Sequence, residues 1–159
     1  MERSKIVSRT YVESKHIENL SHADFDGINI RFKEPISICF YNETKTSQFA
    51  LQMFVSAADS VEGFKFGVVN MDTETELCKR FKELDDEDHP YHWVHTTDMP
   101  FILTYRSGFP QAFYNGNLDD KIMKYYFENL AHVKGHKEGK IADPRVKYQS
   151  NRYLRLFYD

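Results

Sequence analysis

Three histidines recur at every third position beside a run of acidic residues at 85–88. His89, His92 and His95 carry imidazole, which binds zinc and other transition metals together with carboxylates. Pro90 interrupts this segment, however, and side chains three residues apart do not align on one face of a strand. We therefore expect a long loop in which some histidines satisfy backbone groups, and no metal site.

The two cysteines are a second source of chemistry. Cys39 and Cys78 lie far apart in the sequence, each in an apolar context. Neither their number nor their spacing is typical of a disulfide framework or a zinc site. We expect both to be reduced and buried, and to pack as small hydrophobic side chains.

Hydroxyl groups cluster at Thr44, Thr46 and Ser47, at the start of an amphipathic stretch. A hydroxyl acts as a nucleophile only beside a positioned base, and no histidine lies nearby in the sequence. The pattern favours N-capping of a helix by Thr44 or Thr46.

The elements that would position these groups alternate between strands and helices. Residues 36–41 are apolar on both faces, which predicts a central strand covered on both sides. Residues 46–61 have a helical period, with Phe49, Met53, Ala57 and Val61 on the predicted buried face and Ala50 and Phe54 beside them.

The rest of the chain continues this alternation. Residues 64–71 predict a strand, and Thr73 with Glu76 forms a capping-box pattern for a helix that ends near Phe81 or Leu84. Residues 101–106 and 111–114 predict a hairpin, and 118–132 a final helix. Nearer the start, residues 6–12 and 16–20 predict short strands, and Ser21 with Asp24 predicts a short capped helix. This order indicates an α/β fold with a mixed sheet and helices on both faces, a three-layer sandwich.

The ordered series resembles the thioredoxin family over about residues 14–132. The residues that carry the resemblance are Ile17–Ser21 leading to Phe25 and Asp26, the strand Ile38–Tyr41, Val68–Asp72, Met99–Phe101, Gly108 and Gly116. The resemblance implies a thioredoxin-like domain over residues 1–134 and a cis peptide bond between Met99 and Pro100.

The resemblance also shows what this chain lacks. The family's Cys-x-x-Cys pair would fall on Lys45, Thr46, Ser47 and Gln48, give or take one residue, beside Pro100. The family's buried acid falls on Cys39. Thiol–disulfide exchange needs a thiolate, which these residues cannot supply. We therefore expect no enzymatic activity of the family type and no cofactor.

Two further segments carry candidate contact residues. The loop at 85–98 is longer than the family's usual connection, and Tyr91 and Trp93 in it would suit a contact surface. Residues 133–159 carry a net charge of +4, whereas the remainder carries −7. Within this segment we separate a basic, aromatic arm at 135–159. Its candidate contact residues are Arg145, Arg152, Tyr153, Arg155, Phe157 and Tyr158.

Three interpretations of the arm stay open. It binds nucleic acid through phosphate neutralisation and stacking, it packs back on its own domain, or it docks on another protein through aromatic and arginine anchors. We favour docking on a protein partner, since the body is acidic and no nucleic-acid recognition motif is present.

The sequence thus predicts a non-enzymatic interaction protein held in a larger assembly. An enzyme with non-thiol chemistry and a nucleic-acid-binding accessory protein are the alternatives. This chain is aromatic-rich and lacks the Cys-x-x-Cys thiols of the family. In these features and in its size it resembles thioredoxin-like virion components of large DNA viruses, which would make it a minor capsid protein. No apolar run is long enough to span a membrane, and the first residues show no secretory signal, so we expect a cytoplasmic or virion location.

Overall fold

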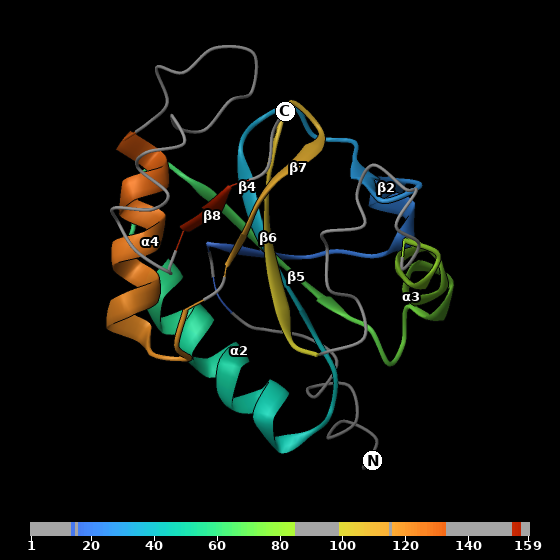
Figure 1. Ribbon diagram of the computed structural model, residues 1–159, viewed down its shortest axis with the longest axis horizontal. Coiled ribbons are helices and arrows are strands. Elements are labelled where there is room, and N and C mark those ends of the chain that lie inside the picture. Colours follow the sequence, from blue (N-terminus) through green and yellow to red (C-terminus); the bar gives the residue numbers. More distant parts are fainter. Residues whose placement is uncertain (1–13, 15, 85–98, 115, 133–153, 157–159) are drawn as a thin grey trace.

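A mixed six-stranded sheet forms the centre of the molecule (Figure 1). The computed structural model describes residues 14, 16–84, 99–114, 116–132 and 154–156. Parallel pairing joins the first three strands in the sheet, and antiparallel pairing joins the others. In spatial order the strands are β1 (Ile17–Asn19), β5 (Lys65–Asn70), β4 (Ile36–Tyr41), β6 (Phe101–Arg106), β7 (Phe109–Tyr114) and β8 (Leu154–Leu156).

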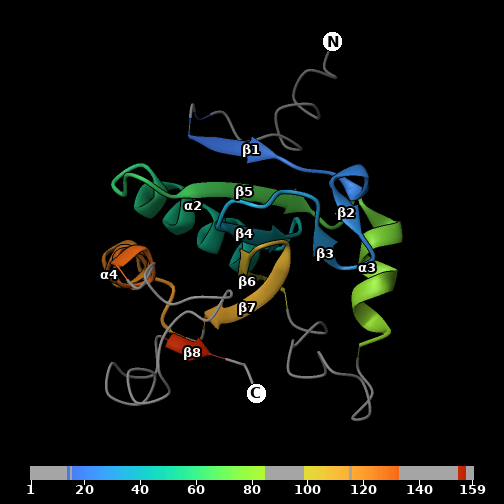
Figure 2. The ribbon, with the colours of Figure 1, turned by 90° about the horizontal axis from the view of Figure 1, so that it is seen from above.

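Helices cover both faces of this sheet, which confirms the predicted three-layer arrangement (Figure 2). Helices α2 (Lys45–Ala58) and α4 (Asp120–His132) pack on one face, and α3 (Thr75–Lys82) packs on the other. Among the described residues, no helix combines the length and apolar character needed to cross a membrane.

Strand β4 is buried along its whole length, as its apolar sequence predicts. Ile36, Ile38 and Phe40 belong to the core on the α3 side, whereas Cys39 and Tyr41 belong to the core beneath α2 and α4. The Phe40 ring stacks on Phe101 of β6 with ring centroids 4.6 Å apart. Aromatic contacts of this kind account for much of the chain's high aromatic content.

The buried face of α2 differs from the prediction. Its buried residues are Ser47, Ala50, Leu51, Phe54, Ala57 and Ala58. Phe49 is 49 % exposed, so its predicted place in the core is wrong. Compared with the predicted face, the side of the helix that faces the core includes Ser47 and Leu51 beside Ala50 and Phe54. Phe49 remains on the surface near the start of the helix.

A short element and a small ribbon precede β4. The 3-10 helix η1 (His22–Asp24) begins at Ser21 with the predicted capping box to Asp24. It leads into an antiparallel pair, β2 (Phe25–Asp26) and β3 (Asn29–Ile30), which the sequence did not predict.

The predicted cap of α3 is wrong. The N-cap is Glu74, without a side-chain capping bond. The Thr73 hydroxyl donates instead to the Asn70 carbonyl, at 3.0 Å.

The hairpin between β6 and β7 closes with a tight turn. Ser107 and Gly108 both have positive φ, at 53° and 91°. Such a pair matches the right-handed twist of the two strands. The peptide bond between Met99 and Pro100, just before β6, is cis, as the resemblance predicts.

Part of the predicted arm belongs to the sheet. Strand β8 pairs antiparallel with β7, with Leu154 opposite Tyr114 and Leu156 opposite Ala112. At these residues the chain packs back on its own domain. The rest of 135–159, the predicted strand at 6–12 and the loop at 85–98 lie outside the described residues.

Candidate functional site

The junction between β4 and α2 is the position at which the family's thiols would lie. Thr44 is the N-cap of α2, and its hydroxyl oxygen accepts from the Ser47 backbone N–H at 3.3 Å. This confirms the predicted helix cap. Lys45 and Thr46 are exposed in the first turn, Ser47 is fully buried, and Gln48 is half-buried.

The side chains of the first helical turn hold the preceding loop. The Ser47 hydroxyl oxygen accepts from the Asn42 backbone N–H at 2.8 Å. The Gln48 amide donates to the Asn42 carbonyl, also at 2.8 Å. Thr44 donates from its hydroxyl and from its backbone N–H to the Asn42 side chain. Asn42 is therefore held by Thr44, the N-cap of α2, and by Ser47 and Gln48 in the first turn of the helix.

A second set of contacts ties this loop to the end of β5. The Glu43 backbone N–H donates to the Asp72 carboxylate at 2.9 Å, and the Asn70 side chain donates to the Glu43 carboxylate at 3.4 Å. The Asp72 backbone N–H in turn donates to the Asn70 side chain at 3.0 Å. Hydrogen bonds thus connect the loop before α2 both to the first turn of the helix and to the end of β5.

Pro100 lies at the same end of the sheet as this junction. Phe101 pairs with Phe40, and Pro100 is one residue beyond that pair, next to the end of β4. The structure therefore brings the predicted residues 45–48 and Pro100 to one end of the sheet.

The two cysteines lie on different elements and differ in burial. Cys39 is fully buried in β4, and burial raises the pKa of its thiol. Cys78 on α3 is half-buried and packs against the core on the opposite face of the sheet. Both thiols are free, and Cys39 is buried as expected, whereas the predicted burial of Cys78 is wrong because this residue is only half-buried on α3.

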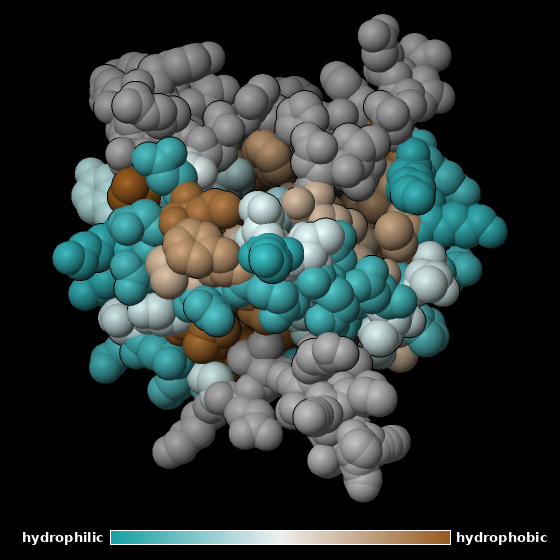
Figure 3. Space-filling model, turned by 90° about the horizontal axis from the view of Figure 1, so that it is seen from below, coloured by the Kyte–Doolittle hydropathy of each residue, from teal (hydrophilic) through white to brown (hydrophobic). Residues whose placement is uncertain are grey.

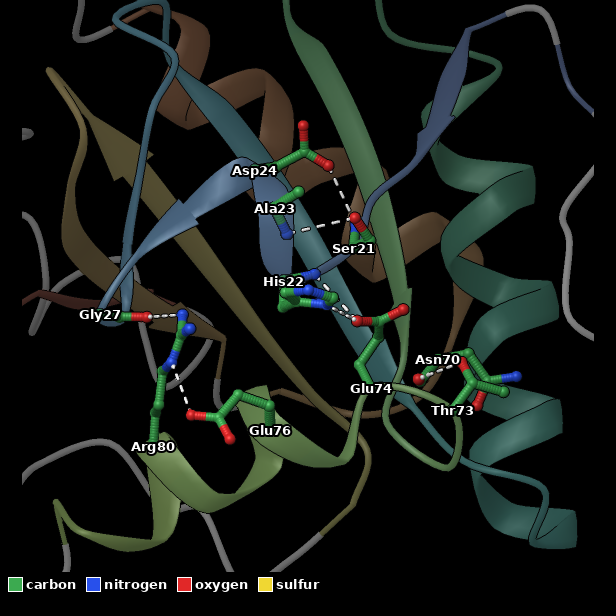
Figure 4. Close-up of polar contacts among 10 residues, drawn as sticks. All are labelled: Ser21, His22, Ala23, Asp24, Gly27, Asn70, Thr73, Glu74, Glu76 and Arg80. Carbon is green, nitrogen blue, oxygen red and sulfur yellow. Dashed lines mark hydrogen bonds and ion pairs between the residues drawn. The ribbon is translucent and has the colours of Figure 1, made fainter.

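A polar cluster joins η1 to α3 on the far side of the sheet (Figure 4). The Glu74 carboxylate accepts from the His22 backbone N–H and contacts its ring Nδ1, each at 2.9 Å. Arg80 donates to the Gly27 carbonyl at 3.0 Å and pairs with Glu76 at 3.5 Å. These contacts anchor the β2–β3 ribbon on α3, and the two hydroxyls drawn beside them, on Ser21 and Thr73, bond to the backbone of Ala23 and Asn70.

A pocket lies at the opposite end of the sheet from the junction. It measures about 640 Å³. Its wall comes from the segments before β4 and β5 and from the end of α2. The residues that line it are His16, Glu34, Pro35, Asp59, Val61, Glu62, Gly63, Phe64 and Lys65. None of the site residues predicted from the sequence is among them.

Several predicted site residues lie outside the described part of the chain. They are Tyr91, Trp93, Arg145, Arg152, Tyr153, Phe157, Tyr158 and the histidines at 89, 92 and 95. Arg155 is described only as the residue of β8 that pairs with Phe113. Within the described ranges, no group of histidine, cysteine and acidic side chains could hold a metal ion.

Comparisons with known proteins place the fold. No protein-family model and no curated protein matches this sequence. The crystal structure of human ERp44 form II matches with a TM-score of 0.58 and 18 % identity, over 77 % of this chain and 32 % of that chain. The J-Trx1 fragment of ERdj5 matches with a TM-score of 0.59 and 18 % identity, over 77 % of this chain and 53 % of that fragment.

This chain therefore spans about a third of ERp44 and about half of the ERdj5 fragment. The shared architecture and the cis proline before β6 agree with the resemblance drawn from the sequence. The protein has a thioredoxin-like fold, in which the described residues contain no Cys-x-x-Cys pair.

Proposed function

We propose that this protein is a non-enzymatic thioredoxin-like interaction domain that works as a component of a larger assembly. The observation that carries the proposal is the network between β4 and α2. Residues 45–48 hold no thiol, and the one buried hydroxyl there, on Ser47, accepts from Asn42. A nucleophile needs access and a positioned base, and Ser47 has no access to solvent.

The surface around the junction is suited to contact. Phe49 is 49 % exposed on α2, close to the vacated position. Figure 3, seen from the side on which α2 begins, shows apolar side chains gathered over α2 and α4. Exposed aromatic side chains give large contact area and are enriched in protein interfaces.

The loop at 85–98 and the arm at 135–159, apart from β8, are the proposed partner-binding segments. The arm is basic and aromatic, and residues 133–159 carry a net charge of +4. A protein partner with an acidic surface suits the arm. A virion component, such as a minor capsid protein, is the finer form of this proposal, and its support is the resemblance noted in the sequence.

An insulin-reduction assay tests the absence of redox activity. We expect the rate with dithiothreitol and the protein to equal the rate with dithiothreitol alone. A higher rate that disappears in the Cys39→Ser/Cys78→Ser variant would contradict the proposal. That double variant separates true thiol turnover from a trace contaminant.

Truncation tests the arm. Tagged full-length protein and a variant that stops after Val133 are used to capture partners from cells that make the protein. We expect the truncated body to be folded and to lose its partner. If the variant that stops after Val133 still captures the partner, the hypothesis that the arm binds the partner is wrong. Binding to DNA that weakens steeply with salt would favour the nucleic-acid alternative instead.

A further inference from the structure

The pocket at the end of the sheet away from the junction has no part in the proposed function. Its volume of about 640 Å³ lies within the range of pockets that hold small organic molecules. Three segments meet around it, namely those that lead into β4 and β5 and the one that follows α2. A space of this size exceeds what a single inorganic ion occupies.

Half-buried apolar side chains form one part of the pocket wall. They are Pro35, Val61 and Phe64. Val61 and Phe64 also pack against the core beneath α2 and α4, and the Phe64 ring contacts that of Phe66 with centroids 5.4 Å apart. The core therefore holds this wall in place, and the wall offers a surface on which an aliphatic group can leave water.

Three carboxylates line the same pocket, each from a different segment. Glu34 precedes β4, Asp59 follows the last residue of α2, and Glu62 lies in the loop before β5. All three residues are exposed, and Asp59 accepts from the Ser14 hydroxyl at 3.1 Å. None of the three forms an ion pair with a side chain in the described part of the chain. Their charges are therefore available to a ligand.

The basic side chains of the pocket do not neutralise these carboxylates. The Lys65 Nζ lies 3.3 Å from the Glu18 carboxylate and 5.4 Å from the ring centroid of Phe32, two residues outside the pocket. His16 forms no ion pair within the described ranges. The end of α2 adds partial negative charge, and the last turn of that helix contains no basic residue. The pocket therefore favours a cation.

The placement of the carboxylates favours an extended cation over a metal ion. Metal ions need several ligands around one point, and no group of histidine, cysteine and acidic side chains in the described ranges could hold one. An aliphatic polyamine instead carries several ammonium groups, which are separated by methylene chains. Each ammonium can face a different carboxylate while the methylene groups lie on the apolar wall.

We infer that this pocket is a binding site for an aliphatic polyamine. The ammonium groups pair with Glu34, Asp59 and Glu62. The methylene chain between them covers Val61 and Phe64. This inference rests on the pocket alone and does not depend on the proposed function.

Isothermal titration calorimetry of the full-length protein with spermidine, at fixed ionic strength, tests the site. We expect one saturable site in the wild type. In Glu34→Gln/Glu62→Gln the dissociation constant should rise about 3- to 10-fold, because two exposed ion pairs with the ligand are lost. The matched control, Asp26→Asn/Glu83→Gln, removes the same charge at exposed positions outside the pocket and should bind spermidine as the wild type does.

Two further ligands test the wild type by itself. Magnesium chloride supplies charge without methylene groups, and propylamine supplies one ammonium only. We expect each to bind at least about tenfold more weakly than spermidine, because neither can use the carboxylates and the apolar wall together.

The inference is overturned if spermidine saturates no site, if the pocket variant and the control variant bind it equally, or if magnesium binds as tightly as spermidine. Should the pocket variant fail to fold, the comparison of the three ligands in the wild type decides. Equal affinity for spermidine and propylamine would then overturn the inference.

Discussion

The backbone N–H of Asn42 donates to the buried Ser47 hydroxyl oxygen at 2.8 Å, across the junction between β4 and α2. Ser47 belongs to the first turn of α2, and Asn42 belongs to the loop that the helix follows. This bond links the two elements at residues 45–48, where the resemblance drawn from the sequence would place a Cys-x-x-Cys pair. A site for exchange chemistry needs a free, accessible group, whereas this group holds the backbone.

Ser47→Ala tests how much the junction depends on this bond. The substitution leaves the Asn42 N–H without its acceptor in a partly buried loop, so we expect a loss of about 1–3 kcal/mol in the free energy of unfolding. Urea unfolding measures it. Thr46→Ala, at an exposed position in the same turn, is the matched control and should change stability by less than about 0.5 kcal/mol. Equal losses in the two variants would show that the bond contributes little.

Gly108→Ala tests the turn between β6 and β7. Gly108 has a φ of 91°, and an added Cβ would lie 3.0 Å from the Ile30 backbone carbonyl oxygen. We expect a loss of about 1–3 kcal/mol, since both the backbone conformation and the contact oppose a side chain. Gly63→Ala is the control, because Gly63 has a φ of 78° and open space around it. The difference in stability loss between the two variants measures the cost of the contact with Ile30. Equal losses would show that this contact does not contribute to the loss in Gly108→Ala.

The two thiols should differ in reactivity with Ellman's reagent. Cys39 is fully buried, whereas Cys78 is half-buried on α3. Burial raises the pKa of the Cys39 thiol, so little thiolate forms there. We expect Cys78 to react in the native protein and Cys39 to react only after urea unfolding. In Cys78→Ser the native signal should vanish, and a fast native reaction in that variant would mean that Cys39 is accessible.

Much of the architecture was predictable because it depends on patterns within single segments. The apolar run 36–41 predicted a strand buried on both faces, and β4 is such a strand. The helical period after Thr46 predicted α2, but the spacing of the apolar residues did not determine which side of the helix faces the core. Tertiary packing selected the rotation that buries Leu51 and Ser47 and exposes Phe49.

Features that depend on contacts between distant segments were not predictable. The β2–β3 ribbon has strands too short for an alternating pattern. The pairing of β8 with β7 joins residues about 40 positions apart. The Arg106 contact with Leu130 likewise requires the packing of α4 on β6, and an arginine in a strand gives no signal of it.

Tyr41→Phe tests the alkaline stability of the fold. Desolvation by burial, followed by the charge of Glu43, raises the pKa of Tyr41 to about 12, while an ordinary tyrosine titrates near 10. The folded state prefers the neutral phenol. The contribution of Tyr41 to the free energy of unfolding is therefore complete below about pH 10, and it is lost as the pH rises towards 12. Tyr41→Phe has no phenol to ionise, so its stability should fall less steeply across this window. Urea unfolding between pH 9 and 11.5 measures the slope, with Tyr125→Phe at a half-exposed position as the control. If the free energy of unfolding falls equally steeply with pH in Tyr41→Phe and in Tyr125→Phe, the buried phenol of Tyr41 does not limit alkaline stability.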